Sequence, residues 1–194
     1  RFYPIKQNNG KKYRKALVLP LELDNRIPAE KIGSSFAYLK EICQLLDKLG
    51  IELIGIKGRN KFMFYNLGIT EDTVMINGKR IQLMSGYNGF PESVSEADII
   101  IGPAGTALIE AGLMGKDYYV FQHSPYHEFN PFVKQALYDV VKVSFSIDDL
   151  RDNILNRQTY KQGHSVNDFV DLRELNNKGE LFHKFENEIM SLVN

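Results

Sequence analysis

The chain has 194 residues, of which 43% are hydrophobic, and this length and composition predict one compact domain with one core. Lys and Arg together number 24, as do Asp and Glu, so the formal charge is zero and no basic tract could neutralise a nucleic-acid backbone. Nucleic acid is therefore not expected as a partner. The sequence also lacks a charge-free run of about 18 apolar residues, so we expect no transmembrane span.

The single cysteine, Cys43, falls on the apolar face of a predicted helix and is expected in the core. One buried thiol argues against a disulfide scaffold and for a reducing compartment such as the cytoplasm. The chain begins with Arg1 rather than Met, which suggests a piece of a longer protein or a trimmed chain.

The first part of the chain predicts a strand, a helix and a second strand. Residues 16–21 (ALVLPL) and residues 51–56 are short apolar runs, and residues 35–49 carry an apolar stripe at helical spacing. Ser34 or Ser35 is expected to cap this helix. The three elements together predict a parallel strand-helix-strand unit.

Two interpretations stay open between residues 61 and 90. The pair Asn77-Gly78 stands between apolar runs at 73–76 and 80–84, which is a strong signal for a type I′ hairpin. A doubly wound fold would instead place a helix and one central strand here.

The second half of the chain continues the alternation of strands and helices. The predicted strands are residues 97–101, 118–122 and 140–145, and the predicted helices are residues 91–97, 131–137, 147–156 and 181–192. Residues 157–170 are polar and aperiodic, so we interpret them as a loop or mobile segment. This order predicts an α/β fold over residues 1–194: a Rossmann-like three-layer α/β/α domain with a mainly parallel sheet.

A Gly-Pro-Ala-Gly-Thr turn follows the strand predicted at 97–101. Gly102 and Gly105 allow a tight turn, and Pro103 ends the strand because it has no N–H. Thr106 is expected to be the N-cap of the next helix. The unpaired N–H groups and the positive dipole end of that helix would face the carboxyl edge of the sheet, where they favour a phosphate group.

Glu110 follows Thr106 by four residues, so it lies on roughly the same helix face, about one turn from the phosphate-binding end. A carboxylate there could accept hydrogen bonds from two ribose hydroxyls, or it could simply complement the helix dipole. Small and apolar neighbours between residues 107 and 113 predict a mostly buried helix. In such a helix a lone carboxylate would need a partner, which favours the ribose interpretation.

The segment from Ser95 to Phe121 resembles the donor-binding motif of GT-B glycosyltransferases, and AGTALIEA at 104–111 is similar to the SGTATLEA-type stretch of lipid-A-disaccharide synthases and related surface-carbohydrate enzymes. The resemblance implies that the glycine turn lines the donor phosphates and that the helix acid binds ribose. The nucleotide-sugar-binding residues that it implies are Gly102, Pro103, Ala104, Gly105, Thr106 and Glu110. Many relatives have Ser or Gly where this chain has Pro103 and Ala104, which would remove a hydroxyl contact to the phosphate.

The same resemblance implies the donor-binding, C-terminal half of a two-domain glycosyltransferase of the hexosyltransferase type, which moves a sugar from a nucleotide diphosphate sugar to a surface polysaccharide or glycolipid. The catalytic base and the acceptor site would come from an N-terminal domain or subunit, so this chain alone would be an incomplete enzyme. No metal and no cofactor are implied. The protein would be cytoplasmic and would associate peripherally with the inner face of the membrane.

Two alternatives to this function stay open at the level of the sequence. One is a nucleotide-sugar epimerase or hydrolase of the same architecture, and the other is a noncatalytic subunit of a two-chain glycosyltransferase. The first alternative needs acids or bases near the sugar. Candidates for that catalytic work are His123, His127 and Glu128, which follow the strand at 118–122 at the carboxyl edge. Three ligands so close on a loop do not predict a metal site without a fourth.

Cationic residues follow the first two predicted strands at the carboxyl edge. Arg26 and Lys31 lie five residues apart in a segment predicted as a loop, and the resemblance implies that they neutralise the donor phosphates. Lys57 and Arg59, after the second strand, are a competing pair. Phe121 is a candidate for stacking on the nucleotide base.

Overall fold

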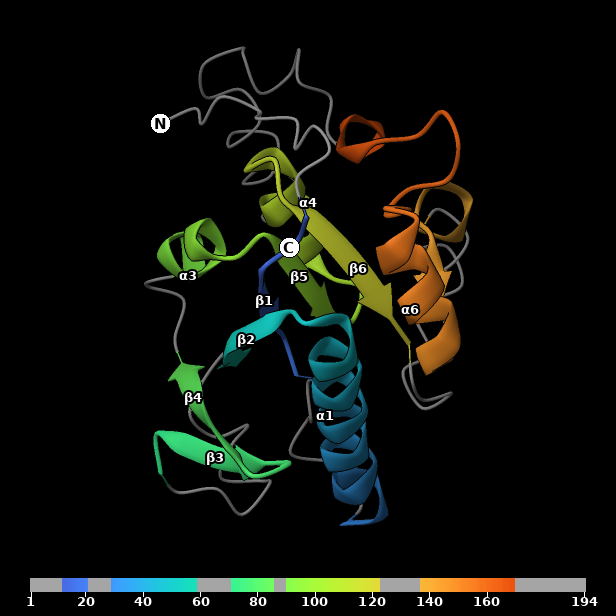
Figure 1. Ribbon diagram of the computed structural model, residues 1–194. Helices are drawn as coiled ribbons and strands as arrows, with labels where there is room; N and C mark the ends of the chain where they lie inside the picture. The colour runs from blue at the N-terminus through green and yellow to red at the C-terminus, as the bar shows by residue number, and fades with distance from the viewer. Residues whose placement is uncertain (1–11, 21–28, 59–70, 86–89, 123–136, 170–194) are drawn as a thin grey trace, which may run out of the picture.

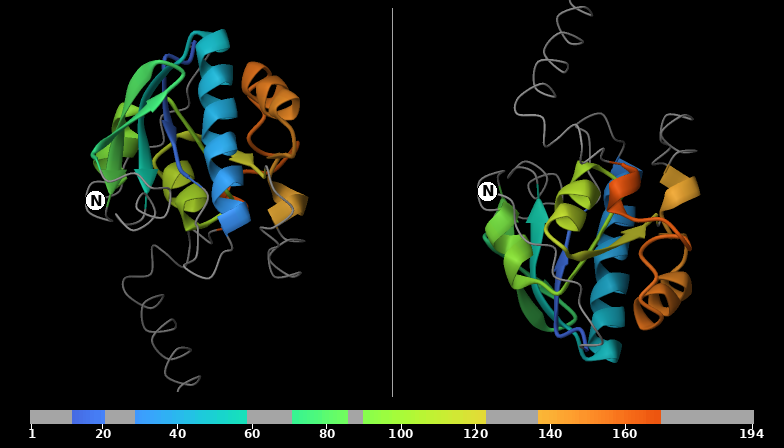
Figure 2. Two further views of the ribbon diagram at one scale, coloured as in Figure 1. Left: turned by 90° about the horizontal axis from the view of Figure 1, so that it is seen from below. Right: turned by 90° about the horizontal axis from the view of Figure 1, so that it is seen from above.

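The computed structural model describes residues 12–20, 29–58, 71–85, 90–122 and 137–169 (Figure 1). They form a seven-stranded sheet with helices on both faces (Figure 2), so the predicted three-layer α/β/α architecture is confirmed. The strands are β1 (Lys15–Val18), β2 (Glu52–Gly58), β3 (Thr73–Ile76), β4 (Lys79–Ser85), β5 (Ile99–Gly102), β6 (Asp117–Phe121) and β7 (Val143–Ser144). The helices are α1 (Ala29–Leu49), α3 (Phe90–Glu96), α4 (Thr106–Leu113), α6 (Ile147–Leu155) and the 3₁₀ helix η1 (Val166–Asp168).

The strand order across the sheet is β3-β4-β2-β1-β5-β6-β7. All neighbouring pairs are parallel except β3 with β4. When the six parallel strands are counted in chain order, their sequence across the sheet is 3-2-1-4-5-6, the order of doubly wound dinucleotide-binding folds. The direction of winding reverses between β1 and β5, and this topological switch point is where ligands of such sheets bind.

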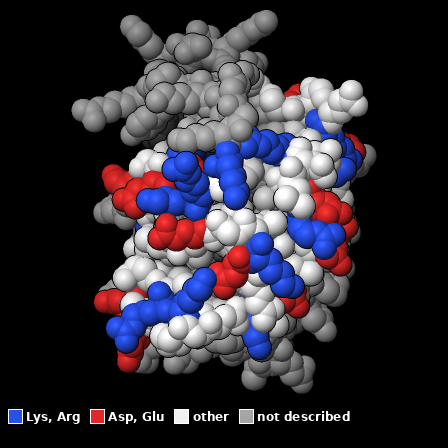
Figure 3. Space-filling view, viewed as in Figure 1, with Lys and Arg blue, Asp and Glu red and all other residues white. Residues whose placement is uncertain are grey.

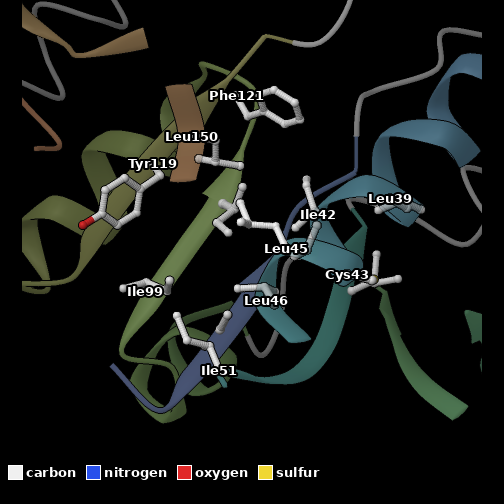
Figure 4. Close-up of a cluster of buried hydrophobic side chains, with 14 of the residues drawn as sticks. Leu39, Ile42, Cys43, Leu45, Leu46, Ile51, Ile99, Tyr119, Phe121 and Leu150 are labelled. Atoms are coloured by element: carbon white, nitrogen blue, oxygen red, sulfur yellow. The ribbon is translucent and has the colours of Figure 1, made fainter. Parts of the chain in front are cut away.

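Two apolar layers hold the helices on the sheet. The layer between the sheet and helices α1 and α6 contains the side chains labelled in Figure 4, which are Leu39, Ile42, Cys43, Leu45, Leu46, Ile51, Ile99, Tyr119, Phe121 and Leu150. Cys43 lies in this layer as predicted, and burial raises the pKa of its thiol to about 11. The layer on the opposite face includes Val94 of α3, Leu108 of α4 and Ile100 of β5.

The hairpin interpretation of residues 73–84 is confirmed. Asn77 and Gly78 both have positive φ, 52° and 77°, as the two central residues of a type I′ turn require. The second strand of this hairpin, β4, also pairs in parallel with β2 and so extends the main sheet. One segment therefore supplies both the hairpin and a strand of the parallel sheet.

Helix α1 begins six residues before the predicted start at residue 35, so Ser34 and Ser35 are inside the helix and do not cap it. The segment from Ala29 to Lys31 contains good helix formers, and a serine in a helix interior costs only a few tenths of a kcal/mol, roughly, relative to alanine. Lys31 is thus helical and is not in a loop as predicted.

The segment 157–170 is only partly a loop. Tyr160 forms an isolated antiparallel bridge with Val141, and Val166 is buried at the start of η1. Val141 lies outside the main sheet in this bridge, and strand β7 contains only two residues of the predicted 140–145. The helix predicted at 181–192 and most of the one predicted at 131–137 lie outside the described residues.

Candidate functional site

The glycine turn of the sequence lies at the topological switch point of the sheet. It starts at Gly102, the last residue of β5, and ends where α4 begins at Thr106. Strand β5 pairs with β1 on one side and β6 on the other, so the turn lies at the carboxyl edge beside the end of β1. The predicted position of the turn in the fold is therefore confirmed.

The first glycine of the turn is required by packing. A Cβ atom on Gly102 would come within 2.5 Å of the Tyr118 hydroxyl and 2.8 Å of the Leu19 Cβ. The same Tyr118 hydroxyl donates a hydrogen bond of 2.7 Å to the carbonyl oxygen of Pro103. Tyr118 is 1% exposed, and burial raises the pKa of its phenol far above its usual range, so it remains a donor. The core thus fixes the path of the turn.

The second glycine of the turn has open space around it. Gly105 is exposed, and a Cβ atom placed on it would meet no atom within 4 Å. It is the N-cap of α4, and no side chain in the described part of the chain caps the helix by a hydrogen bond. Thr106 is exposed and is the first helical residue, so the prediction that Thr106 is the N-cap was wrong by one position. An N-terminus without a capping side chain keeps amide donors for a ligand.

Glu110 lies on the exposed side of α4, together with Thr106. The buried side of the helix is formed by Leu108, Ala111 and Gly112. The shared face of Thr106 and Glu110 is confirmed, whereas the predicted burial of the carboxylate is wrong. Small and apolar residues surround Glu110 in the sequence, but the helical period places the buried ones on the side of α4 away from its carboxylate. Its carboxylate makes no hydrogen bond or ion pair with any described residue.

Lys57 also lies at the carboxyl edge, as the penultimate residue of β2. It is part of the strand and not of a following loop, and it is 7% exposed. Burial lowers the pKa of its ammonium group, and the nearby carboxylate of Glu92 acts in the opposite direction.

The other predicted site residues are less fully described. Arg26, Arg59, His123, His127 and Glu128 lie outside the described residues, and only the backbone of Lys31 is described. Phe121 is described and contradicts its prediction as a base-stacking residue. It is fully buried and stacks on Tyr38 with ring centroids 5.2 Å apart, because β6 turns this side chain toward α1.

Sequence reasoning missed the tyrosines that position the site. Tyr118 and Tyr38 contact residues 15 or more positions away, and no local motif marks such contacts. In the sequence they were part of an aromatic content interpreted as core.

The charges on the described surface are mixed. On the face shown in Figure 3, Lys and Arg side chains alternate with Asp and Glu side chains without a large patch of one sign. Among the described residues, no three His, Cys, Asp or Glu side chains converge to a position that could hold a metal ion. Across the same ranges, no helix has both the length and the apolar character needed to cross a membrane.

Comparisons with known proteins give similarity at the level of structure alone. No protein-family model matches the chain, and neither does any curated protein sequence. Among solved structures, the chain is similar to a variant of the wall teichoic acid polymerase TagF, with a TM-score of 0.46 and 14% sequence identity. The similarity covers 95% of this chain and 46% of the TagF chain, so this chain spans about half the length of that protein. Similarity at this level carries no assignment of activity.

Proposed function

We propose that this chain is the nucleotide-diphosphate-sugar-binding domain of a glycosyltransferase. One observation carries the proposal: the turn from Gly102 to Thr106 lies at the switch point of a sheet with the strand order of dinucleotide-binding folds. In open α/β sheets, ligands bind in the crevice outside the carboxyl ends of the strands at this point. The resemblance of residues 104–111 to a donor-binding motif supports the same position for the donor.

The local chemistry of the turn suits a diphosphate. Gly105 leaves room for close approach of an anion, and the first turn of α4 offers backbone N–H groups and the positive end of the helix dipole. The exposed hydroxyl of Thr106 is a further donor to a phosphate oxygen. Bound phosphates would thus be held mainly by the backbone.

Glu110 would hold the ribose of the same ligand. It is exposed on the Thr106 side of α4, one turn from the helix start, and its carboxylate makes no bond with a described residue. An ionised carboxylate accepts hydrogen bonds from two neighbouring hydroxyls, and such charge-assisted bonds are stronger than neutral ones. A ribose attached to a diphosphate at the helix start lies within reach of this position.

In the transfer reaction, this domain would stabilise the departing nucleoside diphosphate. The helix start would offset the negative charge that develops on the leaving phosphate, which is electrostatic stabilisation of the transition state. The base that deprotonates the acceptor hydroxyl would come from an acceptor-binding domain or subunit. The acceptor would be a surface polysaccharide or a glycolipid, as the resembled motif indicates.

Calorimetric titration with UDP, GDP, CDP and CMP tests the proposal. We expect one nucleoside diphosphate to bind with micromolar to millimolar Kd and Glu110→Ala to weaken it about tenfold, the scale of one lost charge-assisted hydrogen bond. Glu52→Ala is the matched control, because Glu52 is an exposed carboxylate at the amino end of β2. An affinity that Glu110→Ala leaves unchanged removes Glu110 from the site, and absence of binding to every nucleotide refutes the function.

A further inference from the structure

The phenol of Tyr118 lies beneath the glycine turn. Tyr118 is opposite Ile100 in the pairing of β6 with β5, and its side chain belongs to the apolar layer under α4. Its hydroxyl lies 2.5 Å from where a Cβ atom on Gly102 would stand, and it donates a hydrogen bond of 2.7 Å to the carbonyl oxygen of Pro103. Because the phenol is 1% exposed, bulk water competes little for this hydrogen bond.

This hydrogen bond fixes the orientation of the peptide unit between Pro103 and Ala104. Among the described residues no peptide bond is cis, and in a planar trans peptide the C=O and N–H groups point in opposite directions. The Pro103 carbonyl oxygen points to the Tyr118 hydroxyl, so the Ala104 N–H points away from that hydroxyl. The buried phenol therefore directs one amide donor out of the core layer.

The Ala104 amide is not used by the described part of the chain. Pro103 has no N–H, so Ala104 carries the first backbone donor after β5 ends at Gly102. Its N–H makes no hydrogen bond with a described residue. A hydrogen bond accepted by the carbonyl oxygen also polarises the peptide unit, which strengthens the N–H of the same unit as a donor. This amide thus lies just before the uncapped start of α4 as a further donor for an anion.

We infer that Tyr118 is a positioning residue of the anion site: through the Pro103 carbonyl it holds the Ala104 N–H as a donor beside the amides at the start of α4. The inference rests on the proposed function, since the diphosphate at the start of α4 is the ligand proposed there. Tyr118 would not touch that ligand. Without its hydroxyl the peptide unit could rotate, so affinity should fall although no contact to the ligand is removed.

Tyr119, the next residue of β6, provides a matched control. It is also 1% exposed, but it belongs to the opposite layer, where its hydroxyl lies 3.0 Å from the Tyr13 hydroxyl. Phenylalanine in place of either tyrosine keeps the ring and removes one buried hydroxyl with its hydrogen bond. Both variants should therefore melt about 2–4 °C below the wild type. Only Tyr118→Phe removes a hydrogen bond to the turn.

Calorimetric titration with UDP, GDP, CDP and inorganic pyrophosphate, well below the melting temperatures, tests the inference. For each ligand that the wild type binds, we expect Tyr118→Phe to raise the Kd about tenfold and Tyr119→Phe to raise it less than about twofold. A rise that is no larger in Tyr118→Phe than in Tyr119→Phe overturns the inference and leaves the proposed function intact. A wild-type protein that binds only pyrophosphate overturns the function alone, and one that binds none of the four overturns both.

The amide resonance of Ala104 gives a second readout, which a purely structural role of Tyr118 would not move selectively. In the wild type and in Tyr119→Phe, pyrophosphate should shift this amide proton downfield, because the N–H would donate to a charged oxygen. In Tyr118→Phe the shift should be much smaller at saturating pyrophosphate. An Ala104 resonance that moves equally in the three proteins overturns the inference.

Discussion

The two edges of the sheet differ in how their polar groups are satisfied. At the amino edge, the carboxylate of Asp98 accepts hydrogen bonds from the backbone N–H groups of Arg14 and Lys15, at 2.8 and 3.0 Å. The carboxylate of Asp117 accepts a hydrogen bond from the Tyr13 hydroxyl. These bonds tie the starts of β1, β5 and β6 together.

At the carboxyl edge, the polar groups around the glycine turn make fewer bonds with described side chains. Among the described residues, no side chain caps the N-terminus of α4, the carboxylate of Glu110 is exposed, and Lys57 makes no hydrogen bond although the carboxylate of Glu92 lies nearby. Exposed polar groups of this kind are solvated by water when no ligand is bound, and a ligand can replace that water. In the proposed function, the amino edge stabilises the fold and the carboxyl edge receives the ligand.

The largest expected effect is the difference in stability between alanine variants of the two glycines in the turn. Gly102→Ala should destabilise the protein by about 3 kcal/mol, because its Cβ would overlap the Tyr118 hydroxyl and Leu19. Gly105→Ala should change the free energy of unfolding by less than about 0.5 kcal/mol, because two effects offset each other. Alanine is a poorer N-cap than glycine, but it also restricts the unfolded chain, which favours the folded state. Urea denaturation measures both, and nucleotide titration should show loss of affinity in Gly105→Ala. A stable Gly102→Ala protein would contradict the packing role.

At the amino edge, Asp117→Ala should cost roughly 2 kcal/mol of stability because it leaves the buried Tyr13 hydroxyl with one partner fewer. Asp117→Asn is the matched control, since its amide oxygen still accepts a hydrogen bond, and it should cost less. Nucleotide affinity should be unchanged in both variants when measured well below the melting temperature. If Asp117→Ala weakened the ligand as much as Glu110→Ala, the division between the two edges would be wrong.

The smallest expected effect compares two lysines that undergo the same substitution. Lys116→Met removes the donor to the Ser95 and Ala97 carbonyl oxygens at the end of α3, which are 2.9 and 2.7 Å away. We expect the free energy of unfolding, measured by urea denaturation, to fall by about 1 kcal/mol and nucleotide affinity to stay unchanged. Lys57→Met, at the carboxyl edge, should instead weaken nucleotide binding, because Lys57 is a candidate for neutralising the donor phosphates. If the two variants changed nucleotide affinity equally, the contrast between the edges would be wrong.

Several elements could be predicted from the sequence because their signals are local. The turn chemistry of Asn77-Gly78 favours a hairpin, which was one of the two open interpretations. The apolar run before Gly102 predicts a buried strand that ends in a tight turn. The shared face of Thr106 and Glu110 follows from the helical period alone. These features depend on residues within a few positions of one another.

The environment of each site residue depended on distant parts of the chain. The exposure of Glu110 was predicted wrongly because the sequence does not state which side of α4 meets the sheet. The same holds for Phe121, which packs on Tyr38 from a helix 83 positions earlier in the chain.

The sequence by itself determined the strand-helix alternation and the glycine turn, since short-range sterics and periodicity encode them, whereas the hairpin stayed one of two interpretations. Tertiary structure alone decided that β6 lies beside β5, and so that the Tyr118 hydroxyl reaches the Pro103 carbonyl. It also decided which polar groups are paired, as with Tyr13 and Asp117, 104 positions apart. Strand order and burial arise from contacts between remote segments, and local sequence patterns carry no record of those contacts.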